Sequence, residues 1–288
     1  MRTGTVRHNE GRFSGEGRRA LRYRSWEVAK PDAALIVVHG LSEHAGRYAE
    51  FGERMALGGV STFAFDLRGH GDSDGRRGHA SAFDHLVRDV EHFRQEVTGL
   101  VEPGLDIFLL GHSMGGLIAL RYLQQGVAPV SGAVIVSPWL ATAARVPPWK
   151  RRLARVLNDL LPALPFPSGI DPDALSRDPS VVAAYRADRL VHGTITPRLF
   201  CEAEAAMAQA LHNREIPLTE SLLFLIAGDD RLVDSAVAQE AAQSLAVRDR
   251  TVKVWPDTFH EILNAPERAA VVAEILAWIL ARTGRRPA

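Results

Sequence analysis

The chain contains little cysteine, no long apolar run and no excess charge of either sign. Cys201 is the only cysteine among 288 residues, so the count excludes an intramolecular disulfide and a multi-cysteine zinc cluster. A single cysteine favours a reducing compartment, and we expect a cytoplasmic protein. The 34 Lys and Arg residues balance 34 Asp and Glu residues, so no global charge draws the chain to nucleic acid or to acidic lipid.

Segments that direct a protein into or across a membrane are also missing from the pattern. Residues 1–20 are rich in Arg and Gly and hold no apolar stretch like a signal-peptide core, so we do not expect export by that route. The apolar segment 271–280 is interrupted by Glu274 and is too short to cross a bilayer. With 46% hydrophobic and 24% charged residues, the composition is typical of a globular domain.

Short apolar runs alternate with helical patterns along most of the chain. The runs, bounded by turn residues, predict strands at 33–39, 60–66, 106–110, 132–136, 222–227 and 251–255. Helical periodicity is found at 83–100, 115–125, 233–245 and 265–281. This alternation predicts an α/β domain with a mostly parallel sheet that is covered by helices on both faces.

The alternation lapses from about Pro138 to Pro217, where no strand is evident and prolines cluster. We therefore predict a helical cap at 138–217, inserted into an α/β core formed by 1–137 and 218–288. Apolar residues from Trp149 to Leu164 recur at helical spacing with Lys and Arg between them, which predicts a basic amphipathic helix. A second helix is expected to begin at Thr196 as the N-cap and to run toward Leu211.

The motif most informative about chemistry is Gly111-His112-Ser113-Met114-Gly115. It directly follows a predicted buried strand and precedes a helical pattern. A serine on such a tight turn is held in a strained conformation, and the flanking glycines avoid clashes that side chains would cause. The N-terminus of the following helix stabilises negative charge that develops on a substrate. We interpret Ser113 as a nucleophile rather than as part of a glycine-rich turn without function.

A serine hydroxyl needs a neighbouring base at neutral pH, and the base needs an acid to orient it. In chains with this motif the acid and then the histidine follow the serine, each after a late strand. His260 is the only histidine beyond the strand 251–255, which favours it as the base over an ordinary surface histidine. Asp229 and Asp230 both follow the strand 222–227 and compete for the role of the acid, whereas Asp234 is placed to cap the next helix.

Several further segments resemble the monoacylglycerol lipases and bacterial lysophospholipase-like hydrolases of the α/β-hydrolase superfamily. The resemblance covers nearly the whole chain and rests on His39-Gly40-Leu41-Ser42-Glu43-His44, Asp66-Leu67-Arg68-Gly69-His70-Gly71, the serine motif, Asp230-Arg231-Leu232 and Phe259-His260-Glu261. It implies the α/β-hydrolase fold, with a mostly parallel eight-stranded sheet flanked by helices and an inserted helical cap. It also implies Asp230 as the acid, although a spacing one residue shorter than relatives often have keeps Asp229 open.

The turn after the first strand of the α/β core supplies one oxyanion donor in this fold. We expect the backbone N–H groups of Leu41 and Met114 to bind the oxyanion, while His39 is read as a buried histidine bonded to nearby backbone, and Glu43 and His44 as residues that order the loop. His70, Asp72 and His79 do not have the spacing of a zinc motif, so no metal and no cofactor are expected.

We predict a serine carboxylic-ester hydrolase that acts through an acyl-enzyme, with a small-molecule acyl ester as its partner. The resemblance points to monoacylglycerols, lysophospholipids or similar esters, whose acyl chain would lie in a tunnel within the cap. The candidate lining residues are Trp139, Leu140, Trp149, Leu160, Phe166 and Phe200. Alternatives are a short- or medium-chain carboxylesterase of broad specificity, a peptidase and a non-catalytic ligand-binding protein. The basic helix of the cap suggests peripheral contact with an anionic membrane, although a solvated face on a helix that covers the core is favoured. The sequence leaves the oligomeric state open.

Overall fold

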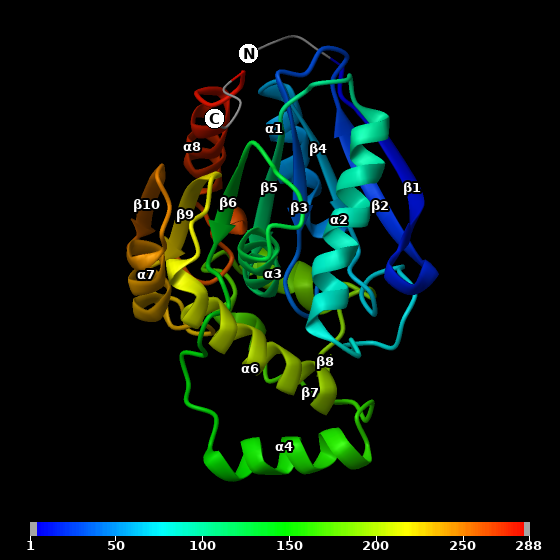
Figure 1. Ribbon diagram of the computed structural model, residues 1–288, viewed down its shortest axis with the longest axis vertical. Coiled ribbons are helices and arrows are strands. Elements are labelled where there is room, and N and C mark those ends of the chain that lie inside the picture. The colour runs from blue at the N-terminus through cyan, green and yellow to red at the C-terminus, as the bar shows by residue number, and fades with distance from the viewer. Residues whose placement is uncertain (1–4, 285–288) are drawn as a thin grey trace.

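One large sheet forms the centre of the computed structural model, which describes residues 5–284 (Figure 1). Its eight strands lie in the order β1-β2-β4-β3-β5-β6-β9-β10. β2 pairs antiparallel with both of its neighbours, and the strands from β4 to β10 are parallel. The strands are β1 Arg7–Gly15, β2 Arg19–Glu27, β3 Ala33–Val38, β4 Val60–Phe65, β5 Ile107–His112, β6 Gly132–Val136, β9 Ser221–Ala227 and β10 Arg250–Trp255. The predicted eight-stranded α/β-hydrolase fold is confirmed.

Helices cover both faces of this sheet because its central strands are apolar on both sides. In β3, Ala34, Ile36 and Val38 pack into one buried cluster and the alternate residues pack into another. The first cluster includes residues of α2 Phe83–Leu100, α3 Met114–Gln124 and α7 Ser235–Ser244, and the second includes residues of α1 Ala49–Leu57 and α8 Arg268–Leu280. Short 3₁₀ helices lie at η1 Glu16–Arg18, η2 Ala45–Tyr48 and η5 Ile262–Asn264.

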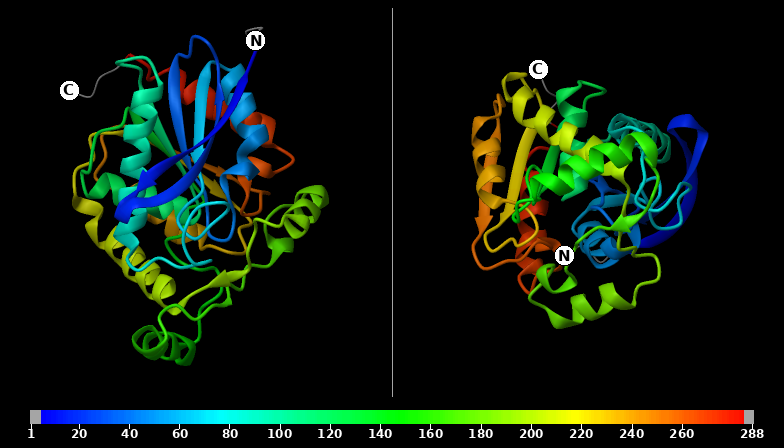
Figure 2. Two further views of the ribbon diagram at one scale, coloured as in Figure 1. Left: turned by 90° about the vertical axis from the view of Figure 1, so that its right-hand side faces the viewer. Right: turned by 90° about the horizontal axis from the view of Figure 1, so that it is seen from below.

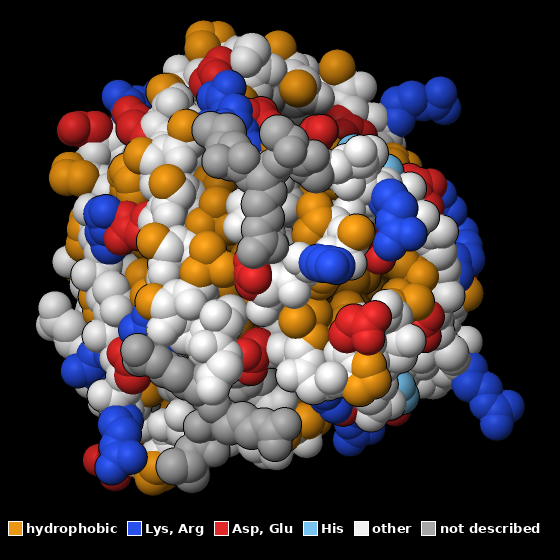
Figure 3. Space-filling model, turned by 90° about the horizontal axis from the view of Figure 1, so that it is seen from above, with side chains coloured by type: hydrophobic (Ala, Val, Ile, Leu, Met, Phe, Trp, Pro, Cys, Tyr) orange, Lys and Arg blue, Asp and Glu red, His pale blue; other side chains and the backbone are white. Residues whose placement is uncertain are grey.

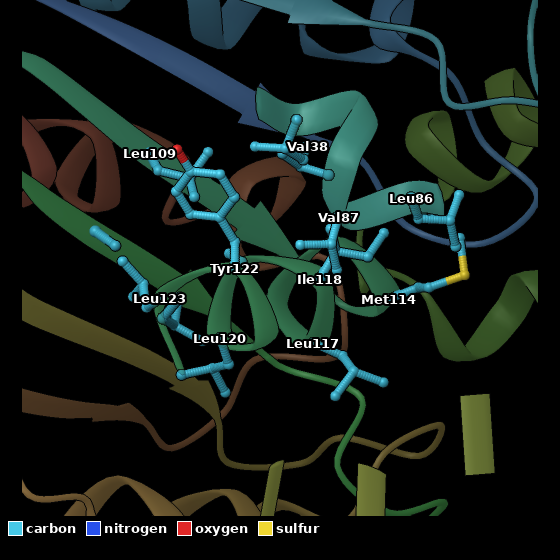
Figure 4. Packing of buried hydrophobic residues seen from close by; sticks show 14 of the residues in the cluster. Val38, Leu86, Val87, Leu109, Met114, Leu117, Ile118, Leu120, Tyr122 and Leu123 are labelled. Carbon is cyan, nitrogen blue, oxygen red and sulfur yellow. The ribbon is translucent and has the colours of Figure 1, made fainter. Parts of the chain in front are cut away.

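The helix α3 is the most deeply buried helix next to the sheet, and every one of its residues is buried. Figure 4 shows its side chains against Val38 of β3, Leu109 of β5, and Leu86 and Val87 of α2. Packing on three sides leaves the helix no freedom to shift. The turn that precedes α3 is therefore held in a fixed position relative to the strand ends.

The sequence patterns predicted no residue ranges for the strands β1 and β2 or for the helix α1. β1 is mostly exposed along its length and contains few apolar residues, so it lacks the continuous apolar run of a central strand. β1 and β2 form an antiparallel hairpin at the edge of the sheet, where one face is open to water. A search for buried apolar runs misses strands of this kind.

The chain between β6 and β9 contains three helices and only a two-stranded pair. Its elements are α4 Pro148–Leu160, β7 Phe166–Pro167, η3 Pro172–Ala174, α5 Pro179–Ala187, β8 Thr194–Ile195, α6 Pro197–His212 and η4 Asn213–Glu215. The predicted start of α6 is confirmed, since the Thr196 hydroxyl accepts a hydrogen bond from the Leu199 N–H. The pair of β7 and β8 was missed because two residues are too few to give a pattern. The first helix ends at Leu160 and not at Leu164, because Pro162 cannot continue it.

The helix α4 lies at the far end of the molecule from both termini, with α6 between it and the sheet (Figures 1 and 2). No residue of α4 is buried, and the side chain of Leu160 is 71% exposed. The interpretation that this helix covers the core with its apolar face is therefore wrong. Its apolar residues face the space between α4 and α6 or the solvent.

A second part of the insertion is firmly attached to the core. The Glu261 N–H donates to the carbonyl of Leu175 at 2.8 Å, and the Asp188 carboxylate binds the His44 ring at 2.8 Å. The Arg47 guanidinium stacks on the Tyr185 ring at 4.7 Å. The segment 175–188 is thus fixed to the loops that carry the motifs, whereas α4 contacts the rest of the chain mainly through α6.

The opposite end of the molecule, viewed in Figure 3, carries basic and acidic side chains interspersed with apolar ones. No broad area of one sign is visible on that face, in line with the balanced charge of the chain. None of the helices within residues 5–284 combines the length and the apolar character that crossing a bilayer requires.

Candidate active site

Ser113 occupies a one-residue turn between β5 and α3, with φ 55° and ψ −116°. This conformation is strained for any residue other than glycine. A Cβ atom on Gly111 would lie 2.2 Å from the carbonyl oxygen of Gly115, and one on Gly115 would lie 2.0 Å from the carbonyl oxygen of Val38. Because such contacts are impossible, the two glycines are what allows the turn to form beside the end of β3. The structure thus accounts for the spacing of the motif.

His260 lies in the loop between β10 and η5, and its Nδ1 atom is 2.7 Å from Oδ2 of Asp230. The other carboxylate oxygen of Asp230 accepts hydrogen bonds from the N–H groups of Leu232 and Val233 at 2.9 and 3.0 Å. With Nδ1 donating to Asp230, the Nε2 atom of His260 is left as a proton acceptor. Burial raises the pKa of Asp230, but the His260 charge and these hydrogen bonds outweigh it, and the pKa is lowered. The carboxylate therefore stays ionised at neutral pH.

The neighbouring aspartates lie in other surroundings. The side chain of Asp229 is 54% exposed and pairs with Arg231. Asp234 is the N-cap of α7, as expected, and accepts hydrogen bonds from the N–H groups of Ala236 and Val237. Of the three carboxylates, Asp230 is therefore the one in place to orient His260.

Ser113 and His260 both line a cavity of about 750 Å³ between the strand ends and the insertion. Trp139, Trp149, Phe166 and Phe200 line it too, as predicted for the acyl tunnel. Leu140 and Leu160 were predicted to line the acyl tunnel as well, but neither residue lines the cavity. Leu140 is only 3% exposed and packs in the core beneath the cavity, and Leu160 faces the solvent at the end of α4.

Two lining residues of α4 were overlooked in the sequence. Leu153 and Leu157 follow Trp149 at intervals of four residues and line the cavity with it. Residues four apart lie on one face of a helix, so this spacing could have identified them. The amphipathic pattern of α4 therefore indicates a helix that lines a cavity and not one that packs on the core.

The first loop of the α/β core lies directly against the serine. A Cβ atom on Gly40 would lie 3.1 Å from the Cβ atom of Ser113, and both Gly40 and Leu41 line the cavity. Met114 is the first residue of α3, where the N–H has no carbonyl of the same helix to bind. The N–H groups expected to bind an oxyanion thus come from two segments that meet at Ser113.

The hydrogen bonds of His39 and His70 to backbone groups indicate structural roles rather than catalytic ones. Nδ1 of His39 donates to the Gly40 carbonyl at 2.7 Å, and its Nε2 accepts from the Leu67 N–H at 2.9 Å. Nδ1 of His70 donates to the Arg68 carbonyl at 3.0 Å. Within the described residues, no group of three or more His, Cys, Asp or Glu side chains could hold a metal ion.

A buried polar cluster that sequence reasoning did not assemble lies beside the catalytic candidates. The Arg47 guanidinium donates to Glu261 at 2.5 and 2.9 Å and to Glu43 at 3.2 Å. Oε1 of Glu43 accepts from the Tyr48 hydroxyl and from Nδ1 of His112 at 2.9 and 3.1 Å. Burial lowers the pKa of His112, but the hydrogen bond and charge of Glu43 outweigh it and the pKa is raised. Glu43 and Glu261 belong to separate sequence motifs and Arg47 to neither of them, so only the fold brings the three residues together.

Comparison with known proteins identifies the family of the chain and several of its relatives. The family described as "Serine aminopeptidase, S33" matches residues 29–267. A monoacylglycerol lipase of Mycolicibacterium smegmatis is 34% identical over 279 residues, which are 94% of this chain and 97% of that protein. A monoglyceride lipase of Homo sapiens is 36% identical over 268 residues, 90% of this chain and 86% of that protein.

Among solved structures, the crystal structure of a Paleococcus ferrophilus monoacylglycerol lipase is similar, with a TM-score of 0.81 and 28% identity. The alignment covers 96% of this chain and 99% of that one, so the similarity includes the insertion as well as the sheet. The family match, the two relatives and the fold agree, and the chain therefore belongs to this family of serine hydrolases with the α/β-hydrolase fold, which includes monoacylglycerol lipases.

Proposed function

We propose that this serine hydrolase cleaves monoacylglycerols or similar medium- to long-chain acyl esters. The observation that carries the proposal is an apolar cavity of about 750 Å³ with Ser113 and His260 in its wall. A cavity of this size holds a small lipid, and its aromatic and aliphatic lining favours an acyl chain. The relatives named as monoacylglycerol lipases support this choice of substrate.

The proposed mechanism rests on the hydrogen bond between His260 and Asp230 and on the place of Ser113 and His260 in the same cavity wall. Nε2 of His260 takes the proton of Ser113 as the serine oxygen bonds to the ester carbonyl carbon. The tetrahedral intermediate then collapses, and His260 gives that proton to the leaving alcohol oxygen. Water, activated by His260, attacks the acyl-enzyme and releases the fatty acid and free Ser113. Asp230 holds the imidazole in the required tautomer and stabilises it when it is charged.

Leu41 and Met114 are the proposed donors to the oxyanion. Their N–H groups belong to the two backbone segments that meet at Ser113. Loss of one such donor typically costs about 3 kcal/mol of transition-state stabilisation. The role belongs to the backbone, so the identity of the Leu41 side chain has little influence on it.

A peptidase that removes N-terminal residues fits the cavity less well. Such an enzyme needs a free carboxylate to hold the substrate ammonium group. The carboxylates of the cavity wall, Glu43 and Glu261, are both bound by Arg47. The apolar lining likewise supports an acyl chain over a peptide. A carboxylesterase of broad specificity for short chains remains the alternative, and it would leave most of the apolar lining unused.

The test is the hydrolysis of a series of 1-monoacylglycerols and p-nitrophenyl esters with acyl chains of increasing length. We expect kcat/KM to rise to about eight carbons and beyond, because each buried methylene adds about 0.8 kcal/mol of binding until the tunnel is filled. Highest activity on acetyl or butyryl esters, with no gain for longer chains, would favour the short-chain esterase. Release of amino acids from peptides, without hydrolysis of any ester, would contradict the proposed function.

We also propose that residues 138–217 act as the cap of the site and that α4 touches the membrane from which the substrate is drawn. The helix combines exposed apolar side chains, Trp149 at 62% and Leu160 at 71%, with exposed Arg151, Arg152 and Arg155. An exposed apolar stripe flanked by basic residues is typical of helices that lie on anionic lipid surfaces. Because α4 also lines the cavity, contact of α4 with a membrane would bring the cavity close to the lipid. Cytoplasmic location stays a prediction.

Vesicle co-sedimentation tests this contact. Binding to vesicles that contain anionic lipid is expected to exceed binding to neutral vesicles and to fall several-fold for the double variant R152E and R155E, because each basic residue near the surface adds about 1 kcal/mol. R248E reverses one charge on the exposed loop between α7 and β10 and is the control for the loss per reversed charge. Equal binding to neutral and anionic vesicles, or equal loss in R248E, would remove the anionic membrane from the proposal.

A further inference from the structure

The loop 40–44, which carries the proposed oxyanion donor Leu41, has a conformation that the chain does not favour by itself. Ser42 has a φ of 69°, in the left-handed region that is uncommon for any residue other than glycine. Ser42 is fully buried, and its hydroxyl has no hydrogen-bond partner in the described part of the chain. A strained conformation of this kind persists only where surrounding contacts hold it. The contacts of the loop 40–44 are therefore what keeps the Leu41 N–H in place.

Hydrogen bonds from the insertion hold this loop. The His192 N–H donates to the carbonyl oxygen of Ser42 at 3.1 Å. Oδ2 of Asp188 lies 2.8 Å from Nε2 of His44. The segment 188–192 of the insertion thus binds both the strained residue and the residue two positions after it.

The hydrogen bonds around His44 and Asp188 give this pair a defined direction. Nδ1 of His44 accepts from the Gly46 N–H at 3.2 Å, so the ring proton is on Nε2 and is donated to Asp188. The other carboxylate oxygen of Asp188 accepts from the Leu190 N–H at 2.8 Å. Burial raises the pKa of Asp188, but the hydrogen bonds from His44 and Leu190 outweigh it and the pKa is lowered. One ionised carboxylate therefore binds the loop 40–44 and also shapes the turn that leads to His192.

The pair of His44 and Asp188 does not reach the cavity in which the ester is expected to bind. Neither residue lines the cavity, whereas Gly40 and Leu41 both do. The side chains of His44 and Asp188 are 6% and 27% exposed. Any effect of the pair on the reaction must therefore pass through the backbone of the loop 40–44.

From these contacts we infer that Asp188 and His44 form a positioning pair that holds the Leu41 N–H against the developing oxyanion. The segment 188–192 then contributes to the reaction without touching the substrate. The inference rests on the proposed ester hydrolysis and on Leu41 as one of its donors. An oxyanion donor is effective at about 2.7–3.1 Å from the oxygen that becomes negative, so a small shift of the loop weakens transition-state binding more than ester binding.

The experiment compares Asp188→Asn with Asp173→Asn in the hydrolysis of a 1-monoacylglycerol. The Asn side chain at position 188 can keep its oxygen on the Leu190 N–H, but its NH₂ group then faces the Nε2 proton of His44, and two donors cannot pair. Asp173 lies in the same insertion and pairs with Arg186 at the surface, so Asp173→Asn is the matched control. We expect Asp188→Asn to lower kcat by about 10- to 100-fold with KM within a few-fold of wild type, and Asp173→Asn to keep both constants.

A pair of inhibitors separates loss of the oxyanion donor from general damage to the site. With a long-chain alkyl trifluoromethyl ketone, the Ser113 oxygen bonds to the carbonyl carbon, His260 takes the serine proton, and the ketone oxygen becomes an oxyanion like that of the transition state. The methyl ketone of the same chain is far less electrophilic and reports binding to the cavity without this adduct. In Asp188→Asn the inhibition constant of the trifluoromethyl ketone should rise by about the factor by which kcat/KM falls, whereas that of the methyl ketone should stay within a few-fold.

His44→Asn breaks the same pair from the other side and serves as a second variant where Asp188→Asn does not fold. Asparagine is a favoured N-cap residue, so its oxygen can accept from the Gly46 N–H, but the shorter side chain does not reach Asp188. The two single variants and the double variant are expected to show about the same loss of kcat, because each breaks one pair that acts as a unit. The thermal unfolding temperature of each variant is the check on folding.

Several results would overturn the inference. One is a kcat of folded Asp188→Asn within a few-fold of wild type, and another is an equal loss in Asp173→Asn. A loss of kcat in Asp188→Asn without weaker inhibition by the trifluoromethyl ketone, or losses that multiply in the double variant, would also contradict it. Absence of ester hydrolysis by the wild-type protein would instead contradict the proposed function, so the two failures are distinguishable.

Discussion

Replacement of Ser113 by alanine is expected to lower kcat for ester hydrolysis by roughly 10⁴- to 10⁶-fold, the loss seen when a nucleophile of this type is removed. The variant keeps the cavity and the oxyanion donors, so a small residual rate over water is expected. The measurement is turnover of the best ester substrate, together with labelling by a fluorophosphonate probe, which should disappear. Folding is expected to be unchanged, because only one hydroxyl at the cavity wall is lost.

The chain offers a closely matched control in Ser137. This serine follows β6, also has a positive φ of 40°, and is 1% exposed. Its hydroxyl has no hydrogen-bond partner in the described part of the chain. Ser137→Ala therefore makes the same chemical change in a similarly strained, neighbouring turn and should retain turnover and labelling. If Ser113→Ala kept its esterase activity, or if Ser137→Ala lost it, Ser113 would not be the nucleophile.

The position of Ser113 could be read from the sequence because local geometry alone demands its neighbours. The turn exists only if Gly111 and Gly115 lack side chains, and both belong to a pattern five residues long. The parallel strands of the main sheet, β3 to β6, β9 and β10, likewise follow from local runs of apolar residues. His260 was identified by its place after a late strand, since the fold leaves few positions from which a base can reach the serine.

Other parts of the site depend on contacts between distant segments and leave no local pattern. Arg47 and Glu261 are separated by 214 positions, and nothing in the residues around either of them indicates that they pair. The sequence of an amphipathic helix likewise does not determine which of its apolar residues face the cavity. The spacing of Trp149 and Leu160 predicts the helix, but which of them faces the cavity depends on how α4 sits against α6.

The spacing of the two aspartates leaves the acid open, and one hydrogen bond supports the proposal that it is Asp230. The sequence offers Asp229 and Asp230 as adjacent carboxylates after β9. Side chains of consecutive residues in an extended turn point in different directions, so only one of them can meet His260. In the structure Asp230 binds His260 while Asp229 pairs with Arg231 at the surface.

Asp230→Asn is accordingly expected to lower kcat by about 10⁴-fold near neutral pH, with the cavity intact. Oδ1 of Asp230 accepts hydrogen bonds from the N–H groups of Leu232 and Val233, and these will hold the amide oxygen of an asparagine in the same place. The NH₂ group must then face Nδ1 of His260 and donate to it. This fixes the proton of the imidazole on Nε2, which can no longer accept the proton of Ser113.

Asp229→Asn is the control for this prediction, because it removes the same charge one residue away. Its side chain is solvated and makes no contact with His260, so kcat should stay within a few-fold of wild type. Both variants are measured in the same ester assay, with the thermal unfolding temperature as a check on folding. A loss in Asp229→Asn with activity kept in Asp230→Asn would transfer the role of the acid to Asp229. Equal small effects in both would mean that His260 is oriented by other contacts, such as the bond from His112 to its backbone carbonyl.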